Sequence, residues 1–294
     1  MTEKFDVIVI GAGPGGYVAA IRAAQLGLST ACIDMTTGKD GKAALGGTCL
    51  NVGCIPSKAL LDSSKHYHHV KNDYAAHGIN VSDVSMDIGT MLTRKDRVVS
   101  KLTGGVAQLF KANQVRQYHG KGRLLANRQV EFTPHASTEK IMLEADNIIL
   151  AAGSVPIAIP NVDYDNKYII DNEAALELTE VPARLGVIGA GVIGLELGSV
   201  WQRLGSTVTL LEALPSFLTM ADEDIAKQAF RLFKRQGLDI RLGTLVKSAC
   251  IVDEEVKVIV EDKNGETEIS FDRLLVAVGR KPYTESLLAD ESGV

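Results

Sequence analysis

The chain has 294 residues, of which 46% are apolar and 23% charged, and its formal net charge is −5. This length suits about two domains that bury their own cores, and the intermixed charges exclude the strongly basic surface of a nucleic-acid or membrane-surface binder. The start, MTEKFDVIVIGAG, lacks the basic region of a signal peptide, and the apolar runs are too short to span a bilayer. With only four cysteines, the composition predicts a cytoplasmic protein.

The first 34 residues have the pattern of a dinucleotide-binding unit. Residues 5–10 predict a buried strand, an apolar helix follows, and a second strand ends at Asp34. Between strand and helix, Gly11, Gly13 and Gly16 form a GxGxxG motif, whose glycines allow a tight turn, the approach of a pyrophosphate and close helix packing. Asp34, 23 positions after Gly11, can accept from a ribose hydroxyl. The alternative, that GxGxxG occurs here by chance, does not explain why the strand, the helix and the acidic residue all lie at the expected spacing.

The stretch GGTCLNVGCIPSK (46–58) places Cys49 and Cys54 five positions apart. Pro56 suits the first turn of a helix, so Cys54 lies near a helix N-terminus, where free amides and the helix dipole stabilise a thiolate. The spacing differs from the zinc pattern CxxC, and the other two cysteines are solitary. As a structural disulfide the pair would contribute only about 2 kcal/mol, because the loop is short. We therefore expect a redox-active pair, with structural pairing as the alternative.

The next segments predict mostly helices over 57–118, short strands over 122–143, and then NIILAAGSVPIAIP over 147–160. The last of these combines an apolar strand, a glycine turn and a proline. RLLVAVGRKPYTE (273–285) repeats that combination, and VKVIVEDKNGETEISF (256–271) predicts a hairpin around Asn264-Gly265. Because the two segments share this strand–glycine–proline pattern, we predict that each one completes a nucleotide-binding unit.

A second copy of the fingerprint lies in ARLGVIGAGVIGLELGSVWQRLGSTVTLLE. Gly189, Gly191 and Gly194 form its GxGxxG motif, and Glu212 again lies 23 positions after the first glycine. Packing alone could explain these glycines, but two matched fingerprints predict two dinucleotides. A carboxylate at Glu212 suits a free ribose 2′-hydroxyl, and the following ALPSFLTMADED has no arginine for a 2′-phosphate, which favours NAD over NADP.

The order GAGPGG, GGTCLNVGCIPSK and GAGVIGLE resembles the flavoprotein disulfide reductases over essentially the whole chain. CLNVGCIPSKALL is most similar to the dihydrolipoamide dehydrogenases among them. The resemblance implies an α/β fold with two Rossmann-like domains: 1–153 binding FAD and carrying the disulfide, 154–280 binding NAD, and 281–294 beginning a return segment. It also implies oxidation of dihydrolipoamide on the acyltransferase component of a 2-oxo acid dehydrogenase complex.

The resemblance further implies the roles of individual residues. Cys49 would exchange with dihydrolipoamide, Cys54 would face the flavin, and Lys58, paired with Glu196, would reach the flavin's reacting edge. The expected FAD contacts are Gly11, Gly13, Pro14, Gly15, Gly16, Asp34, Gly47, Thr48, Lys58, Gly120, Ala152, Gly153 and Ser154. The expected NAD contacts are Gly189, Gly191, Val192, Ile193, Gly194, Glu196, Glu212, Val246 and Gly279.

The sequence departs from the family in two places. Asp34 replaces a more usual glutamate, and the sequence stops before the dimerisation domain that supplies a catalytic histidine and makes the family homodimeric. His66, His68 and His69 are expected on a solvated helix face, without a metal. Three readings remain: part of a complete enzyme, a module that only binds nucleotides, or an NADH-dependent diaphorase.

Overall fold

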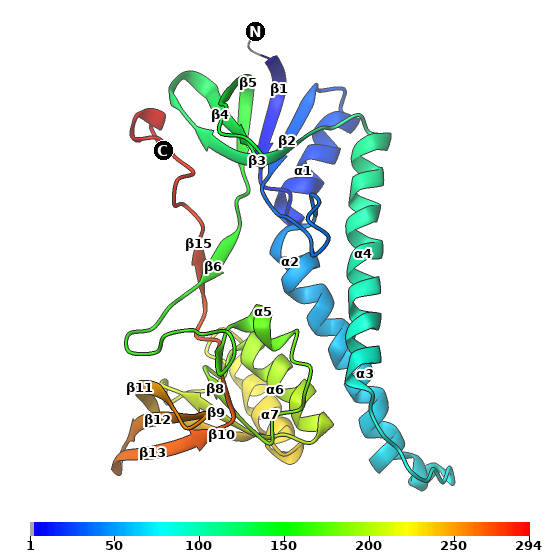
Figure 1. Ribbon diagram of the computed structural model, residues 1–294, viewed down its shortest axis with the longest axis vertical. Helices are drawn as coiled ribbons and strands as arrows, with labels where there is room; N and C mark the ends of the chain where they lie inside the picture. Colours follow the sequence, from blue (N-terminus) through cyan, green and yellow to red (C-terminus); the bar gives the residue numbers. More distant parts are fainter. Residues whose placement is uncertain (1–2) are drawn as a thin grey trace. The chain divides into compact units, whose positions relative to one another are not determined.

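The computed structural model describes residues 3–294, which divide into two compact units (Figure 1). The first contains the chain through Pro56, Asp96–Val155 and Lys281–Val294; the second contains Ser57–Lys95 and Pro156–Arg280. The division therefore differs from the expected domains at residues 57–95, which group with the second unit. The physical reason is burial, because Leu60 and Met91 pack into the apolar core of the second unit.

The first unit is built on a five-stranded sheet that closes on itself in the order β1-β2-β3-β4-β5. Strand β1 pairs in parallel with β2 and β5, β2 pairs in parallel with β3, and β4 pairs antiparallel with both of its neighbours. The carboxyl ends of β1 and β2 thus lie at one edge, where ligands bind in open α/β sheets. The strands are β1 (Glu3–Ile10), β2 (Thr30–Asp34), β3 (Arg116–Leu124), β4 (Gln129–Pro134) and β5 (Ile141–Leu150).

Helices cover one side of this sheet, and the end of the chain pairs with it. Helix α1 packs Ala20 and Ala23 against Val9 of β1, in a cluster that also holds Phe110 of α4 (Ile88–Ala112). The final segment returns to β3, where the Leu124 amide donates to the Leu287 carbonyl (2.9 Å). The helices here are α1 (Pro14–Gln25) and α2 (Gly47–Val52), with short 3-10 turns η2 (Ala126–Arg128) and η3 (Asp290–Ser292).

The second unit contains a parallel sheet in the order β10-β9-β8-β14-β7. Its central strands are buried along nearly their whole length, as expected for parallel strands that are covered on both faces. The elements are β7 (Ile169–Ile170), α5 (Asn172–Ala175), β8 (Arg184–Ile188), α6 (Val192–Leu204), β9 (Thr207–Glu212), α7 (Glu223–Arg235), β10 (Asp239–Leu242) and β14 (Arg273–Val276).

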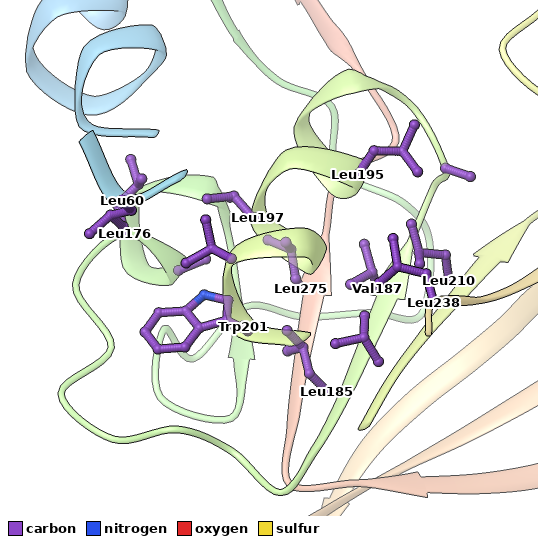
Figure 2. Close-up of a cluster of buried hydrophobic side chains, with 14 of the residues drawn as sticks. Leu60, Leu176, Leu185, Val187, Leu195, Leu197, Trp201, Leu210, Leu238 and Leu275 are labelled. Atoms are coloured by element: carbon purple, nitrogen blue, oxygen red, sulfur yellow. The ribbon is translucent and has the colours of Figure 1, made fainter. Parts of the chain in front are cut away.

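Alternate residues of these strands enter two different cores. Val187 and Leu275 face the helix side, in the cluster around the fully buried Trp201 of α6 (Figure 2). Ile188 and Leu274 face the other side, where an antiparallel three-stranded sheet covers them. That sheet comprises β11 (Leu245–Val252), β12 (Glu255–Asp262) and β13 (Gly265–Phe271).

The predicted hairpin of residues 256–271 is present, one residue out of register with the expected turn. Asp262 pairs with Gly265, so residues 263–264 form the turn and Gly265 opens the second strand with a φ of 111°. The remaining elements are α3 (Cys54–Asn72), η1 (Tyr74–His77), α4 (Ile88–Ala112), and the paired strands β6 (Ser154–Pro156) and β15 (Arg280–Pro282). Across residues 3–294, every helix is too short or too polar to cross a membrane.

Candidate functional site

The first GxGxxG loop joins β1 to α1 so closely that two of its positions admit only glycine. A Cβ at Gly11, where φ is 103°, would lie 2.2 Å from the Ala151 carbonyl oxygen. A Cβ at Gly16 would lie 1.7 Å from the Gly11 carbonyl oxygen. Gly13 and Gly15 have more space. The nearest atom to a Cβ at Gly13 would be 3.8 Å away, and nothing lies within 4 Å of a Cβ at Gly15. The loop is therefore tight where it packs on the sheet and open where α1 begins, with Pro14 as the first helical residue.

The second loop, between β8 and α6, repeats this geometry. A Cβ at Gly189 would lie 2.6 Å from the Ala277 carbonyl oxygen, and one at Gly194 would lie 2.3 Å from the Gly189 carbonyl oxygen. Gly191, which precedes α6, has no atom within 4 Å of a Cβ. The first amides of both helices have no acceptor within their own helix, so each open loop presents donors suited to a phosphate.

The two acidic residues also occupy equivalent positions, at the ends of β2 and β9. The Asp34 carboxylate accepts from the amides of Ala12 (2.6 Å) and Thr36 (2.8 Å). The Glu212 carboxylate accepts from the amides of Ala190 (2.9 Å) and Leu214 (3.0 Å). Each oxygen receives one of these bonds and has a second acceptor direction, so both carboxylates can also receive a ribose hydroxyl.

The cysteine segment is docked directly on the first loop. The Gly46 amide donates to the Ala12 carbonyl (2.9 Å), and a Cβ at Gly47 would lie 2.6 Å from the Gly13 Cα. This contact of two side-chain-free backbones explains why position 47 is a glycine. It places α2, which begins at Gly47 and carries Thr48 and Cys49, beside the open part of the nucleotide loop.

The two cysteines differ in environment. Cys49 is half-buried and packs against the apolar cluster that contains Leu50, whereas Cys54 is exposed and is the first residue of α3. Burial, together with the Asp34 carboxylate, raises the pKa of Cys32 far above its usual range, so that thiol is unreactive.

Within the second unit, Lys58 of α3 forms an ion pair with Glu196 of α6. Ser57, which is 6% exposed, donates its hydroxyl to the other carboxylate oxygen of Glu196 (2.7 Å). The pairing of Lys58 with Glu196 is the one expected from the family resemblance. Ser57 was not predicted, because a serine beside a lysine in a helix carries no signal that its hydroxyl reaches a distant carboxylate.

The other expected contacts lie at strand ends and loops of their own units. Gly120 of β3 has a φ of 152°, and a Cβ there would lie 2.1 Å from the Thr133 carbonyl oxygen. Gly153 accepts a hydrogen bond from the Tyr283 amide (3.0 Å), and Gly279 accepts one from the Ile157 amide (3.1 Å). The remaining expected residues are Ala152 and Ser154 after β5, Val192 and Ile193 at the start of α6, and Val246 in β11.

The histidines of α3 are engaged with acidic residues four positions away in the chain. The His69 Nδ1 lies 2.5 Å from the Asp73 carboxylate, and the His66 Nε2 lies 3.5 Å from that of Asp62. Among residues 3–294, no three histidine, cysteine, aspartate or glutamate side chains are grouped as a metal site requires. The helix therefore presents these imidazoles as locally paired surface groups.

Comparison with known proteins places these features in one family. The chain is 49% identical to a dihydrolipoyl dehydrogenase of Cupriavidus necator, over the whole chain and 62% of that protein. It is 44% identical to the mitochondrial dihydrolipoyl dehydrogenase of Pisum sativum, over the whole chain and 58% of that protein. The chain thus spans about 60% of the length of these relatives.

Solved structures and a family model give the same assignment. The HOCl-induced flavoprotein disulfide reductase RclA from Escherichia coli superposes with a TM-score of 0.77 at 27% identity, over 96% of this chain and 58% of that one. The model of the pyridine nucleotide-disulphide oxidoreductases matches residues 5–294. With its two nucleotide loops and its cysteine segment, the chain belongs to the pyridine nucleotide-disulphide oxidoreductase family.

Proposed function

We propose that this chain forms the nucleotide-binding and dithiol-oxidising part of a dihydrolipoyl dehydrogenase. It would oxidise dihydrolipoamide, carried by the acyltransferase component of a 2-oxo acid dehydrogenase complex, and reduce NAD. The observation that carries this proposal is the docking of the cysteine segment on the first nucleotide loop, through Gly46 on Ala12 and Gly47 on Gly13. A thiol pair held against a nucleotide loop is suited to exchange electrons with what that loop binds.

The first loop fits FAD. Gly15 is open and Gly13 carries no side chain, which leaves room for a pyrophosphate, and Asp34 has acceptor directions left for a ribose. Further contacts are assigned to Pro14, Thr48, Gly120 and residues 152–154 on the family resemblance. When bound, FAD supplies the two-electron chemistry that links the dithiol to NAD.

The second loop fits NAD. The Glu212 carboxylate, held by two backbone amides, presents acceptors to a ribose 2′-hydroxyl and repels a 2′-phosphate. Residues 213–224 contain no arginine that could bind such a phosphate. We assign contacts with NAD to residues 189–194, Glu196, Glu212, Val246 and Gly279.

The cysteines would act by thiol–disulfide exchange. A substrate thiolate attacks the Cys49 sulfur of the oxidised pair, and Cys54, the first residue of α3, leaves as a thiolate. The second substrate thiol then displaces Cys49, which closes the substrate to its disulfide and leaves both cysteines reduced. Cys49, the more buried of the two, would meet the substrate, and Cys54 would face the flavin, with Lys58 one helical turn further along α3.

An absorption spectrum tests this function. We expect the purified chain with FAD to gain a long-wavelength charge-transfer band after anaerobic addition of dihydrolipoamide, and Cys54→Ser to lose that band. Cys250→Ser, which changes an exposed cysteine on β11, is the control and should keep the band. A bound flavin whose spectrum does not change on addition of the dithiol would instead support a module that only binds nucleotides. Dye reduction by NADH that persists after substitution of both Cys49 and Cys54 would support a diaphorase.

The assembly and the compartment also belong to the proposal. We propose that the enzyme of which this chain forms part is a homodimer, as in the family, and acts in the cytoplasm within a 2-oxo acid dehydrogenase complex. The support is the likeness of residues 46–61 to the dihydrolipoamide dehydrogenases and the similarity to a bacterial protein of that name.

A further inference from the structure

The carboxylate of Glu196 is held by two neighbouring residues of α3. Its Oε1 receives the Lys58 ammonium, and its Oε2 receives the Ser57 hydroxyl at 2.7 Å. All three residues lie in the second unit. The side chains of consecutive helix residues such as Ser57 and Lys58 point about 100° apart. The Glu196 carboxylate can therefore accept from both only by using a different oxygen for each.

The two donors are not equivalent anchors. The Lys58 side chain is 59% exposed, so its long stem has other orientations in solvent. Ser57 is 6% exposed, and its short side chain has few alternatives. A buried serine in a helix commonly bonds to the carbonyl one turn earlier, but the Ser57 hydroxyl is directed across to α6 instead. The fixed point of the trio is therefore Ser57, and the mobile member is Lys58.

We propose that Ser57 is a positioning residue: its hydroxyl clamps the Glu196 carboxylate, so that the carboxylate holds the Lys58 ammonium in one place. This inference rests on the proposed function, in which that ammonium serves the flavin. Without the clamp, Glu196 can rotate about its terminal bond, and Lys58 would follow it or separate into solvent. The net value of one hydrogen bond corresponds to about a three- to tenfold change in the population of the held state.

The first test uses the chain without cofactor. A lysine nitrogen that is held against a carboxylate is less available to attack an ester than one that moves freely in solvent. The rate of Lys58 acetylation by an N-hydroxysuccinimide ester, followed by mass spectrometry, therefore reports whether the nitrogen is held. We expect Ser57→Ala to speed acetylation about three- to tenfold and Ser57→Thr, which keeps the hydroxyl, to restore the slow rate. Glu196→Gln defines the rate of the released lysine.

The matched control is Ser64→Ala on the same helix. Ser64 is fully buried and donates its hydroxyl to the Leu61 carbonyl (3.1 Å), so this variant also deletes a buried helical hydroxyl. It should leave Lys58 acetylation unchanged. Equal acceleration in Ser57→Ala and Ser64→Ala, or no acceleration in Ser57→Ala, would overturn the proposal.

A second measurement separates this inference from the proposed function. With FAD bound, we expect Ser57→Ala to shift the flavin reduction potential and Ser57→Thr to restore it. An unchanged potential, with Lys58 released, would refute the link between the clamp and the flavin. Failure of the parent chain to respond to dihydrolipoamide would instead count against the proposed function, since the acetylation result depends on neither flavin nor dithiol.

Discussion

Adding one methyl group at Gly16 should destabilise the first unit. In Gly16→Ala the new Cβ would lie 1.7 Å from the Gly11 carbonyl oxygen and 3.3 Å from the Ala151 Cβ. The nearest atom belongs to the backbone, so no side-chain rotation relieves the clash, and α1 must move away from β1. Overpacking of this kind costs about 1–3 kcal/mol, which exceeds the gain of about 1 kcal/mol from replacing glycine by alanine in a helix. Because the nearest backbone atom lies only 1.7 Å away, the cost falls in the upper part of this range, about 2–3 kcal/mol, and the expected net loss is about 1–2 kcal/mol.

Gly104→Ala is the matched control. Gly104 lies inside α4, and nothing lies within 4 Å of a Cβ there. The same methyl group should therefore raise the free energy of unfolding, by about 0.4–1 kcal/mol. The two variants share the same change in side chain, so the difference between them isolates the clash, at roughly 2–3 kcal/mol.

Urea denaturation followed by circular dichroism measures both variants, and retention of flavin during gel filtration reports on the loop. We expect Gly16→Ala to unfold at lower urea and to retain less flavin than Gly104→Ala. Equal stability of the two variants would refute the claim that the loop and α1 are in direct backbone contact.

Three further predictions follow from groups outside the proposed site. Lys95→Met removes a buried ammonium that is paired with Glu177 and should lower the free energy of unfolding by about 1–3 kcal/mol in urea titrations; an unchanged value would contradict its role as an anchor of α4. Burial, aided by a hydrogen bond to a carboxylate, raises the pKa of Tyr118 to about 12. The stabilisation that comes from this raised pKa is fully present below pH 10, the pKa in the unfolded chain, and is lost as the pH rises to about 12. In Tyr118→Phe the free energy of unfolding should therefore change less with pH over that range. The same pH dependence in both proteins would exclude Tyr118 as the cause. Iodoacetamide should label the exposed Cys250 in the folded chain but the buried Cys32 only after unfolding, which mass spectrometry can measure. Labelling of Cys32 in the folded chain would contradict its burial.

Both nucleotide units could be recognised from sequence because their signals are local. Strand, glycine turn, helix and terminal acid follow one another within about 30 residues, and backbone sterics together with apolar periodicity specify each step. The structure has β1, α1 and β2 within two residues of the expected bounds, and Asp34 and Glu212 end their strands. The cysteine segment could also be recognised from sequence, because Pro56 and the preceding glycines mark the start of α3.

Long-range packing was decided only by the tertiary structure. Nothing in the local pattern of residues 57–95 shows that they belong with the second unit, because an apolar helix face does not specify the core that will cover it. The backbone contact of Gly47 with Gly13 and the bond from Ser57 to Glu196 join residues far apart in the chain. Sequence alone determined which local units form and which chemistry they carry. Tertiary structure decided which of those units touch, because such contacts depend on the fit of surfaces that no single segment encodes.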